Sequence, residues 1–489
     1  MSSSISKLAS GHGAALRVGA LAAVLACGQA GASTHSYLQS LLAATPAGGW
    51  VKASTNQFTS AWAIPGQGGL TEEPHSNPGS VVAAWSGFAW DSTSHNLMLW
   101  GGGHATYRGN EMYVWEGATG QWGRGSLPSR MQQYGNDGTY LVVDDAAPQS
   151  SHPYDNNLYL PKSNMFLTFG GGTYNTGVGG FVVSNGAGGI QRAGPWAWDP
   201  TNADANKVGG TTGSGYVING AGSQSWTNLQ GQWTGTEPWN PSRGYVWNVT
   251  AYREEAGKDV VYLSPQYQST GFPDLFRYEV GNIRNGDIGK WEKVGVTWNA
   301  YAIGGVAAID TTHNLFVRTS PLANQQADLS VWLLSRNNAA NPSANRDTAV
   351  QLLNTDGSEF SLTDNFGMDY DSANDKFYLW SGDGGSMWET QATFDSNGNL
   401  LPTWTVHKRL STTLAQPNGN FLNGVYGKLQ YASDLGAFVA LDEFKFSTNT
   451  GADVWLYKPF ATPVPEPSQL ALLALGLGFL AVRGQRLKG

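Results

Sequence analysis

The sequence predicts a large all-β domain built from repeated strand–turn–strand units. Composition is the first observation behind this prediction, because the 489 residues include 64 Gly, 20 Trp, 20 Tyr and 18 Phe but only 13 % charged residues. A disordered chain would lack these aromatic residues, and a membrane-embedded chain would need several long apolar runs. The second observation is that the apolar runs in the middle of the chain are short and are separated by Gly, Asn, Asp and Ser.

The third observation is a repeat: an apolar strand, a tight polar turn, a second apolar strand and then small residues. The clearest copy joins Phe88–Asp91 to residues 97–103, and a second joins Gly367–Asp371 to residues 376–382. Weaker copies pair residues 157–161 with 165–172, 249–254 with 259–264, 306–310 with 314–319, and 427–432 with 436–442.

The spacing of the copies favours six units. Successive turns lie 56 to 70 residues apart, except for one gap of 93 residues between 161 and 254. Residues 196–200 are a candidate start for a seventh unit in that gap, but no good second strand follows them. In the first copy a third strand (112–116) and a Thr-Gly turn ending at Trp122 follow, which makes four strands per unit. Four-stranded units repeated radially form a β-propeller, here with six blades favoured and seven possible.

Residues 49–53 look like an outer strand, and we expect this strand to close the ring against residues 453–457 of the last copy. Helix is expected only in the two terminal segments.

The repeat resembles the kelch pattern, in which Gly-Gly follows the second strand, an aromatic residue precedes the third, and a Trp follows a Thr-Gly turn. The resemblance extends over residues 46–460, and residues 85–111 are similar to a bacterial group of galactose-oxidase-like kelch propellers. It implies a fold but no particular activity. Galactose oxidase itself depends on a Cys–Tyr crosslink beside copper, and Cys27 is the single cysteine here. We therefore expect neither a cofactor nor a metal.

Residues 1–32 are typical of a signal peptide. Lys7 and Arg17 precede or begin an apolar stretch, and Ala30-Gly31-Ala32 is an A-x-A cleavage site. Signal peptidase is thus an expected partner. The alternative is a lipobox ending at Cys27, which would be lipidated after cleavage.

Residues 463–489 resemble the PEP-CTERM sorting signal. Val464-Pro465-Glu466-Pro467-Ser468 precedes an apolar stretch over residues 470–482 and a basic end with Arg483, Arg486 and Lys488. As a helix the 13 apolar residues would span about 20 Å, short of a hydrocarbon core of about 30 Å. The resemblance implies cleavage by an exosortase, only transient membrane contact through the tail, and an extracellular or outer-surface location in a Gram-negative bacterium that makes exopolysaccharide.

Charge excludes two classes of partner. Of 28 basic residues, two lie in the leader and three lie beyond Ser468, and neither segment contains an acid. The remaining body has 23 basic and 36 acidic residues, a net charge of −13. Such a surface repels nucleic acid and anionic membrane.

Propeller topology predicts where a site lies, because loops between the second and third strands open on the same face as the connections between blades. His104, Tyr107, Asn110 and Glu111 lie on the first such loop, and His152 and Tyr154 precede the next blade. By the same logic this face carries His75, Arg243, Trp298, Asn299, Asn365, Asn423, Asp364 and Asp383.

The predicted ligand-binding residues are His104, Tyr107, Asn110, Glu111, His152, Tyr154 and Arg243. Aromatic faces stack on sugars, and Asn and Arg bind hydroxyl or carboxylate groups. We therefore expect an exported propeller that binds glycan or protein in the exopolysaccharide matrix. The alternative is a carbohydrate-active lyase or hydrolase that uses His104, His152 and Tyr107 for proton transfer. A third, structural role is that His104 only braces its loop.

Overall fold

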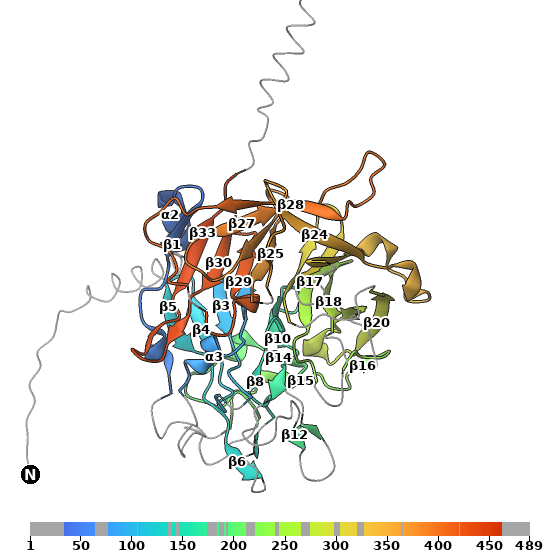
Figure 1. Cartoon of the computed structure of the whole chain (residues 1–489). Coiled ribbons are helices and arrows are strands. Elements are labelled where there is room, and N and C mark those ends of the chain that lie inside the picture. The colour runs from blue at the N-terminus through green and yellow to red at the C-terminus, as the bar shows by residue number, and fades with distance from the viewer. Residues whose placement is uncertain are drawn as a thin grey trace, which may run out of the picture.

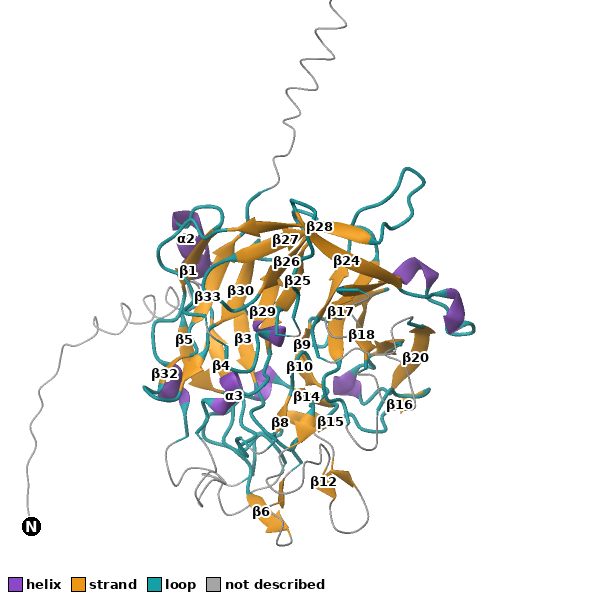
Figure 2. Cartoon of the chain, in the orientation of Figure 1, coloured by secondary structure: helices purple, strands orange, loops and turns teal. Residues whose placement is uncertain are grey.

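The structure is a computed structural model that describes residues 34–63, 77–104, 106–134, 139–142, 146–173, 183–184, 190–191, 194–211, 221–239, 244–265, 274–297, 304–319, 327–363, 365–419 and 421–461. Strands dominate it, and the helices are few and short (Figure 2). The longest described helix, α2 (Thr34–Ala44), precedes the first strand and was not predicted. No helix in these ranges is long and apolar enough to cross a membrane.

Four sheets form separate blades, each with its strands in antiparallel order from the inside outward. The first blade contains β2 (Phe88–Asp91), β3 (Asn96–Leu99), β4 (Tyr113–Glu116) and β5 (Gln121–Arg124). The second contains β9 (Asn157–Leu160), β10 (Met165–Thr168), β14 (Trp196–Trp198) and β15 (Trp226–Asn228). The third contains β17 (Val249–Glu255), β18 (Lys258–Ser264), β19 (Leu275–Glu279) and β20 (Gly289–Gly295), to which β16 (Trp233–Thr234) adds in parallel. The last contains β29 (Leu429–Ala432), β30 (Ala437–Leu441), β33 (Val454–Lys458) and β1 (Gly49–Lys52).

Eight further strands form one sheet, which we call the double sheet, and the other described strands form two-stranded ribbons. One antiparallel half contains β21 (Ala307–Asp310), β22 (Leu315–Thr319), β23 (Leu329–Leu333) and β24 (Thr348–Asn354). The other contains β25 (Gly367–Asp371), β26 (Lys376–Trp380), β27 (Met387–Thr390) and β28 (Thr403–Arg409). The halves are joined where the outer strands β24 and β28 pair in parallel, from Gln351–Thr403 to Asn354–Val406.

The architecture is all-β and propeller-like, but the prediction of six or seven separate blades is wrong. The described strands form four blades and the double sheet, because β24 and β28 are seven residues long and meet at their outer edges. Residues 196–200 do not begin an extra blade, since β14 is the third strand of the second blade. The long gap in the repeat therefore comes from long connections on both sides of that third strand, residues 169–195 and 199–225.

The strand–turn–strand pairs predicted from the repeat are confirmed in all six copies. The predicted ring closure is also confirmed, because β1 pairs antiparallel with β33 and places Trp50 opposite Tyr457. The blue β1 and the red β33 accordingly lie side by side in Figure 1. The Trp50 ring packs against Trp380 at 5.5 Å and donates from Nε1 to the Gly385 carbonyl at 2.8 Å.

The inner strands surround a central cavity. β2, β9, β17, β21, β25 and β29 contact one another in a closed ring, and they line a volume of about 340 Å³. Side chains satisfy their inner-edge N–H groups: Asp155 Oδ2 accepts from the amides of Thr250 and Ala307, and Gln430 Oε1 accepts from the Trp90 amide. Inner strands are thereby held together without forming a continuous ladder.

Candidate functional site

The two predicted histidines lie where three loops meet. His152 belongs to the short strand β8 (Ser151–His152), which precedes the second blade and pairs with β11 (Gly172–Thr173). The loop after β3 approaches this ribbon so closely that a Cβ on Gly103 would lie 2.3 Å from the Ser151 nitrogen. Glycine is required for this approach, which explains the Gly-Gly feature of the repeat. This close approach of the loop to the ribbon brings His104 beside His152.

The imidazoles of His104 and His152 lie 5.6 Å apart between ring centroids, in an edge-to-face arrangement. His104 Nδ1 donates to the Thr173 carbonyl at 3.3 Å, because a carbonyl oxygen only accepts. The Thr106 hydroxyl has carbonyl acceptors on Gly102 and Gly103, so His152 Nε2 donates to Thr106 Oγ1 at 3.1 Å. These bonds fix the tautomers, with a lone pair on Nε2 of His104 and on Nδ1 of His152.

Both histidines favour the neutral form. Burial lowers the pKa of His104, although its hydrogen bond to Thr173 opposes the shift. His152 is only 2 % exposed, and burial together with the neighbouring His104 lowers its pKa well below the usual value. Near neutral pH the pair consists of two uncharged imidazoles that can accept hydrogen bonds or protons.

Aromatic side chains surround His152. Trp85 lies 4.9 Å and Tyr154 6.2 Å from its ring, and Tyr154 in turn lies 6.0 Å from Trp247 and 5.8 Å from Tyr426. We call His104, His152, Trp85, Tyr154, Trp247 and Tyr426 the mouth cluster. His104, Trp85 and Trp247 are half-buried, whereas the other three side chains are buried.

The four aromatic corners share an unusual backbone conformation. Trp85, Tyr154, Trp247 and Tyr426 have φ values of 46°, 54°, 56° and 47°, and each lies two or three residues before an inner strand. Bulky residues rarely adopt positive φ, and such conformations gather at ligand sites and switch regions. The repeated corner thus directs one large ring from each of four connections toward the same place.

Three other predicted residues are not brought to the mouth. Tyr107, Asn110 and Glu111 are at most 2 % exposed and already have partners inside the protein. Asn110 bonds to Ser129 and to the Pro148 carbonyl. Glu111 Oε1 accepts from Tyr107 at 2.6 Å and from Tyr113 at 2.5 Å, and burial raises the pKa of the Glu111 carboxyl. These side chains support the loop from below.

The remaining expectations divide into two groups. Arg243, His75, Trp298, Asn299 and Asp364 lie outside the described residues. Asn423 donates to the Ala83 carbonyl at 2.8 Å, and Asp383 is exposed. Asn365 is also exposed, and its carbonyl accepts from the Val425 amide at 2.7 Å, next to the Tyr426 corner.

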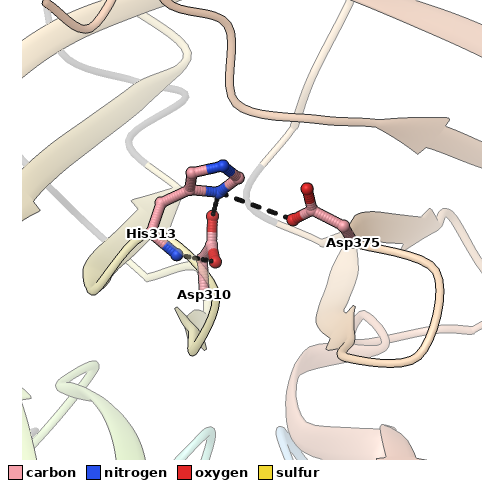
Figure 3. Close-up of side chains that lie close together, drawn as sticks. All are labelled: Asp310, His313 and Asp375. Carbon is pink, nitrogen blue, oxygen red and sulfur yellow. Dashed lines mark hydrogen bonds and ion pairs between the residues drawn. The ribbon is translucent and has the colours of Figure 1, made fainter. Parts of the chain in front are cut away.

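One group of side chains in the described ranges has the composition of a metal site, on the opposite face of the ring. Asp310, His313 and Asp375 place their potential ligand atoms within 4.8 Å of one another, in the turns after β21 and β25 (Figure 3). Asp310 Oδ1 accepts from the Thr312 and His313 amides, and Asp310 Oδ2 lies 2.8 Å from His313 Nδ1. Because Nδ1 donates its proton to Asp310, the arrangement is an internal hydrogen-bonded clamp.

Sequence reasoning missed Trp85, Trp247 and Tyr426. The signal was present, because Trp85, Tyr154 and Tyr426 each stand three residues before the inner strand of their copy. Aligning the copies on their first strands would have revealed an aromatic residue at this recurring position.

Comparison with known proteins identifies the tail. Residues 463–486 match the model of the PEP-CTERM protein-sorting motif. No curated protein matches the sequence. Among solved structures, an α-L-arabinofuranosidase, Arb93A from Fusarium graminearum in complex with an iminosugar inhibitor, has 11 % identity and a TM-score of 0.39, with 76 % of this chain and 92 % of that chain covered. The Dos1 propeller has 10 % identity and a TM-score of 0.36, with 85 % and 95 % covered.

Neither structural likeness supports a conclusion about function, and the kelch pattern remains a prediction. The sorting motif implies export and processing by an exosortase. The chain is therefore an exported protein with a C-terminal PEP-CTERM sorting motif and a propeller-like all-β fold.

Proposed function

We propose that this protein is an exported kelch-like propeller, residues 46–460, that binds glycan of the exopolysaccharide matrix at the mouth cluster. The proposal includes removal of residues 1–32 by signal peptidase and release from the tail. The observation that carries it is a connected cluster of rings, in which His152 contacts His104, Trp85 and Tyr154, and Tyr154 contacts Trp247 and Tyr426. Indole and phenol faces stack on the apolar faces of sugar rings, and imidazole nitrogens accept hydrogen bonds from hydroxyl groups.

Location supports the proposal as well. A PEP-CTERM protein is exported, and polysaccharide is an abundant polar ligand outside the cell. The half-buried rings of Trp85 and Trp247 are the accessible aromatic surfaces of the cluster, whereas Tyr154 and Tyr426 support them from within. We therefore assign sugar stacking to the two indoles and hydrogen bonding to His104.

A glycan array probed with the exported protein, followed by calorimetric titration of the best ligand, tests the proposal. Trp247→Ala should weaken binding at least tenfold, or about 1.4 kcal/mol, because it removes a stacking face. Trp233→Ala is the matched control, since Trp233 is also half-buried but lies on β16, away from the mouth cluster. Equal affinity in the Trp247 variant and the control would refute the site.

Catalysis is the second candidate function, and the neutral imidazoles favour it. His104 Nδ1 and His152 Nε2 are the donors of these neutral rings, so the other nitrogen of each ring is the candidate base for proton abstraction in a polysaccharide lyase reaction. Incubation with matrix polysaccharides, read out by chain length and by ultraviolet absorbance of unsaturated ends, distinguishes the two. Degradation that His104→Ala abolishes would establish the enzyme, whereas unchanged polymer with measurable affinity supports binding alone.

A further inference from the structure

A fully buried arginine lies behind the mouth cluster. Arg318 is on β22, one residue from the end of that strand that faces the mouth, and it is 0 % exposed. Its neighbours Leu315, Phe316 and Val317 are apolar core residues, so a guanidinium here interrupts an otherwise apolar strand. Charged side chains are almost never fully buried without an ionic partner.

The guanidinium is only partly satisfied by the protein. Nη1 donates to Ser264 Oγ at 2.6 Å and to the Pro265 carbonyl at 2.9 Å. Nε and Nη2 are buried and have no hydrogen-bond partner, and within the described ranges no carboxylate lies within 4 Å of the group. Arg277 provides the contrast, because its three nitrogens bond to Glu255, Glu292 and Glu279.

The unpartnered edge has a recognisable chemistry. Nε and Nη2 of arginine form a planar pair of donors that matches the two oxygens of a carboxylate or of a sulfate ester. Burial lowers the pKa of Arg318 to about 9, while Asp347 and Asp155 oppose the shift from a distance, so the group remains charged at neutral pH. An unpaired buried charge is strongly destabilising, and an anionic ligand would remove that penalty.

Arg318 is linked to the mouth through one strand. Its cross-strand partner on β21 is Ala307, whose amide donates to Asp155 Oδ2 at 3.0 Å. Asp155 directly follows Tyr154. Arg318 Nη1 also donates to Ser264, whose cross-strand partner Val249 lies two residues after Trp247. The guanidinium therefore lies close to the backbone that follows two corners of the mouth cluster, Tyr154 and Trp247.

We infer that the Nε–Nη2 edge of Arg318 binds an oxyanion of the glycan held at the mouth cluster, either a uronate carboxylate or a sulfate ester. The inference rests on the proposed function, because the sugar is what brings the oxyanion to this place. It also gives the acidic protein a local means of recognising an acidic polysaccharide. Specificity for the acidic sugar then comes from two directed hydrogen bonds, and not from the electrostatic field of the whole protein, which is negative.

Titration of the exported, processed protein with three trisaccharides tests the inference. The probes are trigalacturonate, its neutral methyl ester and a sulfated galactan trisaccharide, all at one ionic strength. The wild type should bind one acidic probe at least tenfold more tightly than the ester, and the preferred probe identifies the oxyanion. Arg318→Lys keeps the charge but loses the planar pair, so it should abolish the preference and leave affinity for the ester unchanged. Arg277→Lys is the matched control and should retain the preference.

The outcomes separate the inference from the proposed function. Equal binding of acidic and neutral probes by the wild type would overturn the inference and leave glycan binding intact. A folded Arg318→Lys protein that keeps the preference would overturn it too, and binding of no glycan would overturn both. If Arg318→Lys does not fold, the Nε signals of ¹⁵N-arginine decide on the wild type. The preferred acidic probe should shift one signal that persists in Arg277→Lys, and an unchanged spectrum contradicts the inference.

Discussion

Histidine occurs in two contrasting places on opposite faces of the ring. At the mouth, His104 and His152 lie among aromatic rings, and burial is the largest cause lowering the pKa of each. On the turn face, His313 lies 2.8 Å from Asp310 and 3.5 Å from Asp375 and packs on Phe394 (Figure 3). The same side chain is thus an uncharged ring among aromatic side chains in one place and a donor to carboxylates in the other.

The difference teaches how a site is distinguished from a structural clamp. In the turn cluster each polar atom that defines the clamp has a partner within the protein, so the cluster completes itself. The mouth places aromatic faces and imidazole lone pairs together, and Arg318 behind it has an unpartnered donor pair. Polar groups that folding leaves without partners indicate a ligand site, whereas polar groups that bond to one another indicate a role in stability.

Among the variants that test this comparison, we expect Asp310→Ala to lower the free energy of unfolding most. The Asp310 carboxylate is 0 % exposed and accepts from two backbone amides and from His313. Its removal takes the shared acceptor from three donors of a part-buried turn, so we expect the free energy of unfolding to fall by about 3 kcal/mol. Urea unfolding followed by tryptophan fluorescence measures the loss, while glycan affinity should not change.

Asp356→Ala is the matched control for this variant. Asp356 also accepts from a backbone amide and a hydroxyl, both of Ser358, but its turn is exposed to water. Water replaces the lost acceptor there, so the loss should be far smaller. Equal losses in the two variants would contradict the view that burial makes the turn clamp important.

These two faces also differ in how far the sequence predicts them. The turns were predictable because their chemistry is local: Asp91 and Asp371 end their strands and accept from amides two and three residues later. The proximity of His104 and His152 followed from loop topology. The recurring aromatic position can be found by aligning the copies, but its left-handed conformation and the β24–β28 pairing depend on contacts between distant segments, which the sequence pattern does not show. The sequence analysis did not single out Arg318, because one charged residue in an apolar strand does not show whether its donors have partners.

The second effect is a pH dependence specific to the mouth. His152 has a folded-state pKa well below 6.5, so below pH 6.5 the unfolded chain binds a proton that the folded one does not. Stability is then lost as the pH falls, by up to about 1.4 kcal/mol per pH unit for this group. His152→Gln keeps a donor toward Thr106 but cannot titrate, so its stability should decline less between pH 7 and pH 5.

The difference between the wild-type and His152→Gln curves is the quantity to measure, by thermal or urea unfolding at each pH. Asp369, whose pKa burial raises to about 7, contributes with the opposite sign, but it is present in both proteins and cancels. Parallel curves would mean that His152 has the same pKa in the folded and unfolded chains, which would contradict the lowered pKa on which the contrast with His313 depends.

The smallest effect is expected from His313→Ala on the turn face. His313 donates to Asp310 Oδ2, whereas both backbone amides donate to Oδ1 of the same carboxylate, so removing the imidazole takes one partner from Asp310 and leaves its two amide bonds in place. The side chain is 31 % exposed, and a hydrogen bond of this kind contributes about 1 kcal/mol. His407→Ala on the exposed surface is the control. If His313→Ala lowers the free energy of unfolding as much as Asp310→Ala does, the histidine rather than the aspartate holds the turn together. If His313→Ala instead alters glycan affinity, the two faces are coupled through the inner strands. That result would contradict the view that the turn cluster serves stability alone.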